Sequence, residues 1–506
     1  MQTNPGGISL RNILPQARYS RTGDYLFSAC CSDSRNVRPG DLFVALVGSH
    51  EDGHTHIAEA VERGASAILT ERFVSSTVPL CIVPDTREAY GEICQILTGN
   101  PCEKLFLVGV SGTQGKTATA MLLASIFKEA HLSTGIISSL GISDSLNVRD
   151  ASDLTWQPPE MARTLSKFSA NGCSHAIVEV PSQALAYRTT AGLLLDAAVM
   201  TNIRSDHLDI HGSVENYRRA QRRLFAHTKP DGYVVLNTDD AGNHASLASL
   251  NQPTLTTAIK DDAQLTATVI DRCASEQTFL IHAGHQSIPV RTQITGNAHI
   301  HYCLQASATA LAAGLDLPLI VRGIEALDAI PGYLDRVECG QPFNVFIDGA
   351  RTADQLSRTL KTLRQVTTGR LICVMGPAAH DDPRQRPLLG GVAQRTADTL
   401  IITSNSPAYE PPLQIIHDVL DGCADPARPL VSPDRARAIH TALDCATPND
   451  TVIITGKGHV TCQQIEHRML PFDDHLVARD WLYAEGAQRN YASQDTASEE
   501  SLFHLN

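Results

Sequence analysis

The chain lacks the segments that would place it in a membrane or send it out of the cell. No apolar run approaches the roughly 20 residues of a membrane-spanning helix, and the N-terminal segment has no apolar core of signal-peptide length. The 13 cysteines never occur as CxxC pairs, so free thiols in a reducing compartment explain them more simply than disulfides or zinc. We therefore expect a soluble, cytoplasmic protein with no membrane partner.

Charged residues are also scarce, at 19% of the chain, and the formal net charge is −13. This acidic balance excludes a broad nucleic-acid-binding surface, which needs an excess of Lys and Arg. Local glycine-rich loops and single lysines can still bind phosphate groups. The 506 residues are 42% hydrophobic, which suits about three domains with buried cores. We expect a monomer that binds no nucleic acid.

Strand-like and helix-like runs alternate along the chain, which predicts an α/β fold with parallel sheets. In the first segment, DLFVALVG, ASAILTERF and PLCIVPD are strand-like and IAEAVERGA is helical. The residues GNPCEK then mark a boundary, because Gly, Asn and Pro interrupt regular structure. This pattern predicts a small α/β domain over residues 1–103.

The middle segment, residues 104–330, continues with predicted buried strands that end in polar residues. They are His175–Val180, Asp196–Ile203 and Tyr233–Asp240. A more antiparallel set is expected next, from TLTTAI, TATVIDRC, TFLIHAG and QSIPVRTQIT, followed by a helix over HIHYCLQASATALAAGL. Residues 331–506 repeat the alternation: NVFIDGA, RLICVMGP, DTLIITSNSP and TVIITGKGH predict strands, and ADQLSRTLKTLRQV and PLQIIHDVLDG predict helices. The third segment therefore predicts a nucleotide-fold-like α/β domain.

The most informative segment is Leu105–Leu122, LFLVGVSGTQGKTATAML. An apolar run ends at a glycine-rich turn, and helix-forming residues follow Lys116 and Thr117. Backbone N–H groups of such a loop, together with the helix N-terminus, bind phosphate oxygens. The lysine neutralises the β- and γ-phosphates, and the threonine hydroxyl binds Mg²⁺. The segment therefore predicts a site for ATP and Mg²⁺.

The spacing of the glycines in this loop is unusual. The common pattern has a glycine where this chain has Val110, and the glycines fall instead at Gly109, Gly112 and Gly115. A glycine-rich turn that binds nothing is the alternative interpretation. The residues predicted to contact ATP are Gly112, Thr113, Gln114, Gly115, Lys116, Thr117 and Ala118.

Several ordered motifs resemble the Mur ligase family, and within it the MurE ligases. They are SDSRNVRPGDLFVALVGSHEDGHTHI, GVSGTQGKT, EVPSQAL, TNIRSDHLDIHGSVENYRRAQRRLF, VFIDGARTADQL, VMGPAAHDDPRQRPLLGGVA and ITGKGH. The resemblance runs from about Ser32 to Trp481. Folylpolyglutamate synthetases share the phosphate loop, but the SDSR and DHLDIHG segments favour MurE.

The resemblance implies three domains: a UDP-binding domain (1–103), a central ATP-binding domain (104–330) and a C-terminal domain for the amino-acid substrate and closure (331–506). It implies an ATP-dependent ligase of peptidoglycan precursor synthesis. Such an enzyme adds an amino acid to UDP-MurNAc-L-Ala-D-Glu through an acyl phosphate, with Mg²⁺. Its partners would be these small-molecule substrates.

The resemblance also implies roles for single residues. Glu179 would bind Mg²⁺ beside Thr117, and Lys116, Glu179 and His207 would be the catalytic residues. Asn202 and His207 would lie at the ATP and second-metal site, with His207 as a metal ligand, and Asp348 would bind the ATP ribose. A solvated acid at the end of a strand is the alternative interpretation of Glu179. The residues implied for UDP-sugar binding are Ser34, Ser49, His50, Thr155, Ser182 and Arg188.

The chain departs from the family pattern where the chemistry is expected. Gln221 stands where the family has a lysine that is carbamylated to hold the second Mg²⁺, and Tyr333 stands where it has a phosphate-binding arginine. The diaminopimelate-specific members carry D-N-P-R and a glutamate after G-x-G-H, where this chain has Ala408 in place of the arginine and Val460 in place of the glutamate. Residues 378–382 replace a glycine- and charge-rich loop. Recognition of a zwitterionic side-chain head should therefore be poor.

Two interpretations stay open from the sequence. The first is an active ligase of the MurE type with an altered amino-acid substrate. The second is a catalytically impaired homologue that binds nucleotide and has a binding or regulatory role.

Overall fold

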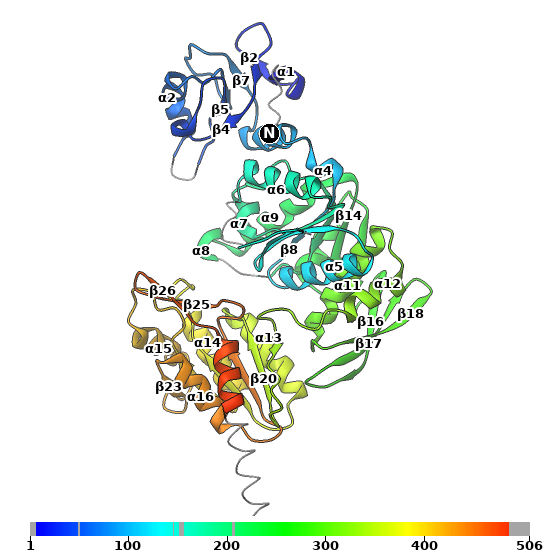
Figure 1. The fold of residues 1–506 in the computed structure, drawn as a ribbon, viewed down its shortest axis with the longest axis vertical. Helices are drawn as coiled ribbons and strands as arrows, with labels where there is room; N and C mark the ends of the chain where they lie inside the picture. The colour runs from blue at the N-terminus through cyan, green and yellow to red at the C-terminus, as the bar shows by residue number, and fades with distance from the viewer. Residues whose placement is uncertain (1–6, 49–50, 145, 151–155, 205–207, 485–506) are drawn as a thin grey trace, which may run out of the picture. The chain divides into compact units, whose positions relative to one another are not determined.

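The computed structural model describes residues 7–48, 51–144, 146–150, 156–204 and 208–484. The chain divides into two compact units. The first comprises Met1–Gln264 with Gln305–Asp316, and the second comprises Leu265–Leu304 with Leu317–Asn506. Each unit contains parallel sheets with helices on their faces, which confirms the α/β fold class (Figure 1).

The first unit begins with a five-stranded sheet in the order β2-β7-β6-β5-β4. Strands β4 to β7 are parallel and β2 is antiparallel to β7. Two helices cover opposite faces because strand side chains alternate: Phe43 packs with one helix, and Leu42 packs with the other. The elements are β2 (Arg18–Tyr19), β4 (Cys30–Cys31), β5 (Leu42–Val44), α2 (Ile57–Glu62), β6 (Ala67–Thr70), β7 (Leu80–Ile82) and α3 (Thr86–Leu97).

A larger sheet follows in the same unit, with the strand order β11-β10-β9-β12-β8-β13-β14-β15. The six strands from β9 to β15 in this order are parallel, and the β10–β11 hairpin extends one edge. The strands are β8 (Phe106–Ser111), β9 (Thr134–Ser138), β10 (Gly141–Ser143), β11 (Val148–Arg149), β12 (His175–Glu179), β13 (Leu195–Met200), β14 (Thr228–Asn237) and β15 (Thr254–Ala258).

The register of this sheet aligns the carboxyl ends of its central strands. Glu179 of β12 lies opposite Val110 of β8, and Met200 of β13 lies opposite Ser111. Helix α5 (Lys116–Glu129) packs on one face of the sheet, while α6 (Pro158–Ala170) and α9 (Val214–Arg222) bury side chains on the other (Figure 1). The fold therefore brings the loops after β8, β12 and β13 to one edge.

The second unit contains an antiparallel meander and one further sheet of mostly parallel strands. The meander is β16 (Leu265–Arg272), β17 (Gln277–Ala283) and β18 (Gln286–Thr292). The sheet has the order β19-β20-β24-β21-β22-β23, and only β19 is antiparallel. Its strands are β19 (Asp335–Arg336), β20 (Asn344–Asp348), β21 (Leu371–Met375), β22 (Thr399–Thr403), β23 (Leu430–Ser432) and β24 (Thr451–Thr455).

Helices cover both faces of this sheet. Helix α13 (Ala353–Val366) begins with a capping box between Thr352 and Gln355. It packs with α14 (Gln385–Thr396) and α15 (Pro412–Leu420) on one face, and α16 (Arg435–Cys445) packs on the other. A hairpin of β25 (Cys462–Ile465) and β26 (Arg468–Pro471) follows β24. The long helix α11 (Asn297–Ala312) and α12 (Leu317–Glu325) precede the sheet.

Two details differ from the expectations. Strand β15 pairs in parallel with β14, whereas β16, β17 and β18 form the antiparallel pairs that the sequence predicts. At GNPCEK a one-turn helix, α4 (Pro101–Lys104), begins at a proline in its first turn, because proline is already set for the first helical position.

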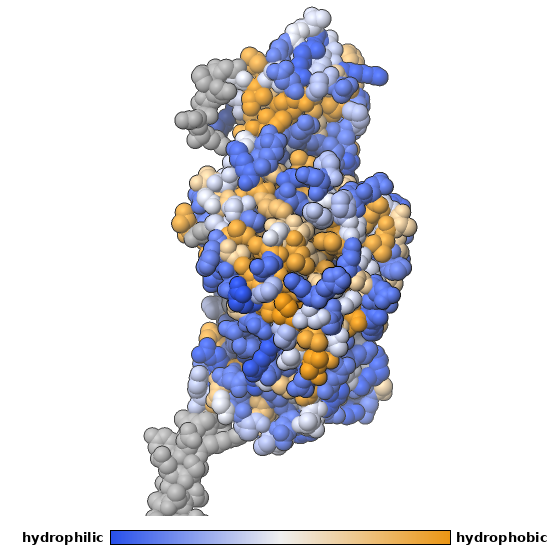
Figure 2. Space-filling model, turned by 90° about the vertical axis from the view of Figure 1, so that its right-hand side faces the viewer, coloured by the Kyte–Doolittle hydropathy of each residue, from blue (hydrophilic) through white to orange (hydrophobic). Residues whose placement is uncertain are grey.

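The face of the molecule drawn in Figure 2 is mixed in hydropathy. On the face drawn in Figure 2, hydrophilic residues are interspersed with separate apolar patches. Within the part of the chain that the structure describes, no helix has both the length and the apolar character needed to cross a membrane.

Candidate functional site

The loop between β8 and α5 has an open helix N-terminus. Gly112 (φ +136°) and Gly115 (φ +83°) both have left-handed backbones, and a Cβ on Gly112 would lie 2.0 Å from Thr201 Oγ1. Gly115 is the N-cap of α5 and offers no side chain to cap it. The first N–H groups of the helix have no acceptor within the helix, so they form a positively polarised anion site.

Asn202, which follows β13, holds the loop in this shape. Its backbone carbonyl accepts a hydrogen bond from Thr113 N (2.9 Å), its Oδ1 accepts from Gln114 N (3.2 Å) and its Nδ2 donates to Gln114 O (2.9 Å). Asn202 is only 5% exposed. The structure thus brings Asn202 to the loop, where it contacts both ends of one loop residue.

Charged and hydroxyl groups surround the start of α5. Lys116 Nζ folds over the loop and donates to Gly112 O (3.0 Å). Thr117 Oγ1 donates to Glu179 Oε2 (2.9 Å) and lies 3.0 Å from Ser139 Oγ. Ser139 N also donates to Glu179 Oε2 (3.0 Å). The helix start, the end of β12 and the end of β9 therefore meet at one carboxylate.

This arrangement fits one Mg²⁺. Mg²⁺ prefers oxygen ligands and keeps several waters or phosphate oxygens, so one hydroxyl and one carboxylate suffice. Thr117 and Glu179 are already within hydrogen-bond distance of each other, and Glu179 is buried. Among the described residues, no group of three His, Cys, Asp or Glu could hold a metal.

Gln221 lies inside the protein beneath the loop. It is fully buried, and its amide lies 2.9 Å from both Ser111 Oγ and the Tyr217 hydroxyl. The Tyr217 hydroxyl in turn lies 2.8 Å from Thr113 Oγ1. The neutral amide of Gln221 is therefore engaged in internal hydrogen bonds.

Three of the residues predicted for UDP-sugar binding lie among described residues. Ser182, the first residue of α7 (Ser182–Ala186), is buried and its Oγ lies 3.1 Å from His211 Nε2. Ser34 Oγ donates to Glu59 Oε2 (2.6 Å). Arg188 pairs with Asp85 (2.5 Å) and Glu88 (2.7 Å) of the first domain.

Arg188 also lines a cavity of about 320 Å³ within the first unit, and the opposing Glu88 and Asp85 hold its pKa above the ordinary value despite burial. The other predicted residues, Ser49, His50, Thr155 and His207, lie outside the described residues.

Asp348, at the carboxyl end of β20, is enclosed by its own domain. It accepts hydrogen bonds from Leu334 N (3.0 Å), Ala350 N (3.0 Å) and Thr359 Oγ1 (3.1 Å). Burial raises the pKa of its carboxyl group to about 6, and these hydrogen bonds only partly offset the shift. Tyr333 lies half-buried nearby, and desolvation also raises the pKa of its hydroxyl group. Ribose binding by Asp348 stays a prediction.

Other polar residues at this edge are also paired internally. Arg435 and Asp474 form a fully buried pair, with Arg435 Nε 2.8 Å from Asp474 Oδ1. Lys457 is buried and donates to Cys462 O, and burial lowers its pKa. Ala408 has a left-handed backbone (φ +47°) and donates from its N–H to Gln464 O (3.1 Å) of β25.

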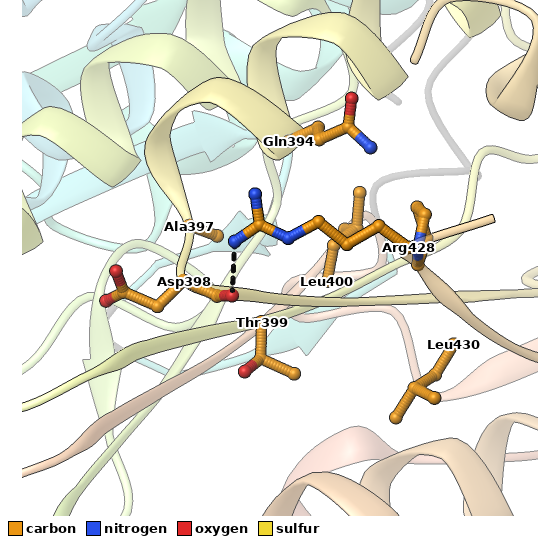
Figure 3. Close-up of a pocket in the computed structure, with 8 residues that line it drawn as sticks. Gln394, Ala397, Asp398, Thr399, Leu400, Arg428 and Leu430 are labelled. Carbon is orange, nitrogen blue, oxygen red and sulfur yellow. Dashed lines mark hydrogen bonds between the residues drawn. The ribbon is translucent and has the colours of Figure 1, made fainter. Parts of the chain in front are cut away.

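A further cavity of about 230 Å³ lies at the opposite end of β22. Figure 3 shows Arg428 reaching across it, where its Nη2 donates to Asp398 O (3.2 Å). Asp398 directly precedes β22, so this cavity lies at the amino end of a parallel strand. None of the predicted site residues lines it.

Comparison with known proteins places these features in a family. Residues 27–96 match the Mur ligase family catalytic domain, residues 110–310 the Mur ligase middle domain and residues 334–458 the Mur ligase glutamate ligase domain. A UDP-N-acetylmuramoyl-L-alanyl-D-glutamate–2,6-diaminopimelate ligase of Geobacillus kaustophilus is 36% identical over 93% of this chain and 98% of its own length. The chain belongs to the Mur ligase family. The resemblance and the three-domain architecture expected from the sequence are thereby confirmed.

Other relatives of this Mur ligase agree. A ligase of the same name from Aquifex aeolicus is 33% identical over 90% of this chain and 93% of its own length. A solved structure of a ligase of that name is 26% identical, with a TM-score of 0.71 and coverage of 95% of this chain and 99% of the other. The MurF ligase of Thermotoga maritima shares the fold, with a TM-score of 0.60 at 17% identity and coverage of 90% and 98%.

Two residues at the site had no signal in the sequence. Ser139 is exposed and follows β9, 22 positions after Thr117 in the chain. Its strand was not among those singled out, although the carboxyl ends of parallel strands share an edge. Tyr217 lies on α9, where one tyrosine among charged residues indicates only a helix face that is buried.

Proposed function

We propose that this Mur ligase is an ATP-dependent ligase of the MurE type that adds an amino acid to UDP-MurNAc-L-Ala-D-Glu. The observation that carries the proposal is the loop at the start of α5. Its first N–H groups are open, Lys116 lies over it, and Asn202 holds its backbone in place. The names of the full-length relatives supply the substrates.

In the first step, the substrate carboxylate attacks the γ-phosphorus of ATP. The bond from that phosphorus to the bridging oxygen breaks, which gives an acyl phosphate and ADP. Lys116 and the N-terminal N–H groups of α5 offset the phosphate charge, since such transfers depend on positioning and charge neutralisation. When bound, Mg²⁺ would add positive charge beside the phosphates, and Thr117 and Glu179 are the residues that would hold it.

In the second step, the amino group of the incoming amino acid attacks the acyl carbon. The carbon–oxygen bond to phosphate breaks, the amide forms and the amine loses a proton. Enclosure of the acyl phosphate away from water protects it from hydrolysis. We assign the residue ranges 1–103, 104–330 and 331–506 to UDP, ATP and amino-acid binding. Ser34, Ser182 and Arg188 belong to the UDP-sugar part of this proposal.

Phosphate release tests the proposal directly. We expect phosphate to appear only when ATP, Mg²⁺, UDP-MurNAc-L-Ala-D-Glu and an amino acid are all present. The same mixture should contain a UDP-linked tripeptide by mass spectrometry. ATP binding without any product would reject the ligase proposal.

That outcome would favour a second function, a nucleotide-binding homologue without turnover. The specific observation in its favour is Gln221, which is fully buried and hydrogen-bonded inside the protein. It therefore brings no anionic oxygen to the phosphate site.

A further inference from the structure

A chain of five polar contacts runs beneath the phosphate loop. Val180 O lies 2.7 Å from Ser111 Oγ, which lies 2.9 Å from the amide of Gln221. The other end of the amide lies 2.9 Å from the Tyr217 hydroxyl, which lies 2.8 Å from Thr113 Oγ1. Arg204 N donates to Thr113 Oγ1 at 2.9 Å. The four side chains are buried, with Ser111 and Gln221 at 0% exposure.

The number of available protons fixes which group donates and which accepts in each of these hydrogen bonds. The carbonyl of Val180 has no proton, so the contact at 2.7 Å requires the hydroxyl proton of Ser111. Ser111 then has no proton for Gln221, so the amide must donate to Ser111 through Nε2. Its Oε1 therefore faces Tyr217, and this hydrogen-bond pattern assigns which end of the amide is oxygen and which is nitrogen.

The remaining protons follow from this orientation. Tyr217 must donate to Gln221 Oε1, so Thr113 must donate to Tyr217, and the N–H of Arg204 donates to Thr113. Position 221 therefore needs a side chain that donates at one end and accepts at the other. A neutral amide does both, whereas a carboxylate cannot donate and an ammonium group cannot accept.

The two ends of the chain lie at the proposed site. Thr113 is part of the phosphate loop, and Val180 directly follows Glu179. We propose that Gln221 and Tyr217 are positioning residues, whose directed hydrogen bonds hold the phosphate loop and the end of β12 in the geometry that binds nucleotide. This inference rests on the proposed function, because it assumes that the loop binds a nucleotide.

Replacing the amide by a carboxyl group makes the inference testable. In Gln221→Glu, the protonated acid can donate to Ser111 and accept from Tyr217, as the amide does, but the carboxylate cannot donate. Among the residues that the structure describes, the titratable groups around this position include the Tyr217 hydroxyl, the His211 ring (edge-on to Tyr217 at 5.0 Å) and Glu179, which faces Thr117 and Ser139. The wild type carries all of these groups, so it reports their own effect on the pH profile.

The experiment measures Mg–ADP affinity by calorimetry between about pH 5.5 and 8.5. We expect Gln221→Glu to bind ADP close to the wild-type affinity at low pH and about tenfold or more weakly once the carboxyl group ionises, relative to the wild type at the same pH. Tyr217→Phe should weaken ADP binding about tenfold at every pH, because it removes the hydroxyl group that joins Gln221 to Thr113 in this series of hydrogen bonds.

Gln305→Glu is the matched control. Gln305 is also a fully buried glutamine, but its Nε2 donates to Met200 O (2.8 Å) and no described hydrogen bond joins it to the loop. Its ADP affinity should follow the wild-type pH profile. Thermal unfolding of each variant at each pH separates lost folding from lost binding.

Each outcome decides the matter. If folded Gln221→Glu follows the wild-type profile, or if Gln305→Glu shows the same pH dependence, the positioning role is wrong. If Gln221→Glu does not fold, Tyr217→Phe decides, and an unchanged affinity overturns the inference. If the wild type itself binds no ADP, the proposed function fails first and the inference fails with it.

Discussion

Two sheet edges in this protein use the same backbone architecture in opposite ways. At the carboxyl edge of the central sheet, Asn202 and Thr201 bond to the loop backbone while the N–H groups at the start of α5 stay open. At the corresponding edge of the third domain, Asp348 accepts three internal hydrogen bonds and Lys457 is buried. Both edges follow parallel strands, where α/β proteins place ligands.

The difference teaches that polar residues at such an edge are not themselves evidence of a binding site. What matters is whether their donors and acceptors are already used. Side chains around the phosphate loop are used to shape a backbone that stays available. Those of the third domain stabilise the domain, which leaves fewer charged groups for a substrate.

Breaking the buried pair of the third domain should have the largest effect on stability. Asp474→Ala leaves the Arg435 guanidinium buried without its carboxylate, which costs about 3–5 kcal/mol. Urea unfolding measures the loss. The control is Glu276→Ala, which removes the exposed partner of Arg291 and should change stability little. Equal losses in the two variants would contradict the assigned role of the buried pair.

Asp348 should make stability depend on pH. Its pKa is raised by burial from 3.8 to about 6, so the folded state binds its proton more tightly than the unfolded state. Stability should therefore fall by about 3 kcal/mol as the pH rises from about 4 to 6, and stay level above that range.

Asp348→Asn should remove this fall in stability with rising pH, as measured by urea unfolding across the same pH range. A slope that persists unchanged in the variant would assign it to another group.

The choice of amino-acid substrate tests whether the third domain lacks charged groups for recognition. Ala408 and Val460 supply no charge where the family resemblance implies Arg and Glu in diaminopimelate-specific members, so we expect about 1.5–3 kcal/mol of discrimination to be absent. Competition between diaminopimelate, lysine and neutral amino acids in the ligase assay measures this. A strong preference for diaminopimelate would show that other residues of the third domain recognise its far end.

Lys116→Ala tests whether the loop between β8 and α5 binds the nucleotide. Removing the ammonium group above the loop should weaken ATP binding about tenfold, or about 1.4 kcal/mol, by calorimetry. Lys128→Ala is the control, since Lys128 is an exposed residue in the last turn of the same helix. An affinity for ATP that is equal in the two variants would move the nucleotide site elsewhere.

Local patterns in the sequence predicted much of the fold. The helix expected over ADQLSRTLKTLRQV is α13, with the same bounds, because its apolar spacing and its capping residues agree. The strand, loop and helix around Lys116 also appear as expected. The parallel pairing of β15 was missed, since a short run of threonines and leucines does not encode the direction of its partner.

The candidate site was less predictable, because its contacts join distant segments. The hydrogen bond between Ser111 and Gln221 spans 110 positions, and no local pattern around Gln221 indicates that its amide is buried. Ser139 was missed for the same reason. Asp348 could be placed at a strand end from the sequence, but its three internal donors come from separate segments.

The clamp of Asn202 on Gln114 has a consequence for the timing of the reaction. A loop whose peptide groups are already held on both sides needs no ordering when a nucleotide arrives, so little conformational entropy is lost on binding. Arrival and departure of the nucleotide should then leave this loop unchanged. Any slow conformational step in a catalytic cycle would belong to other parts of the molecule.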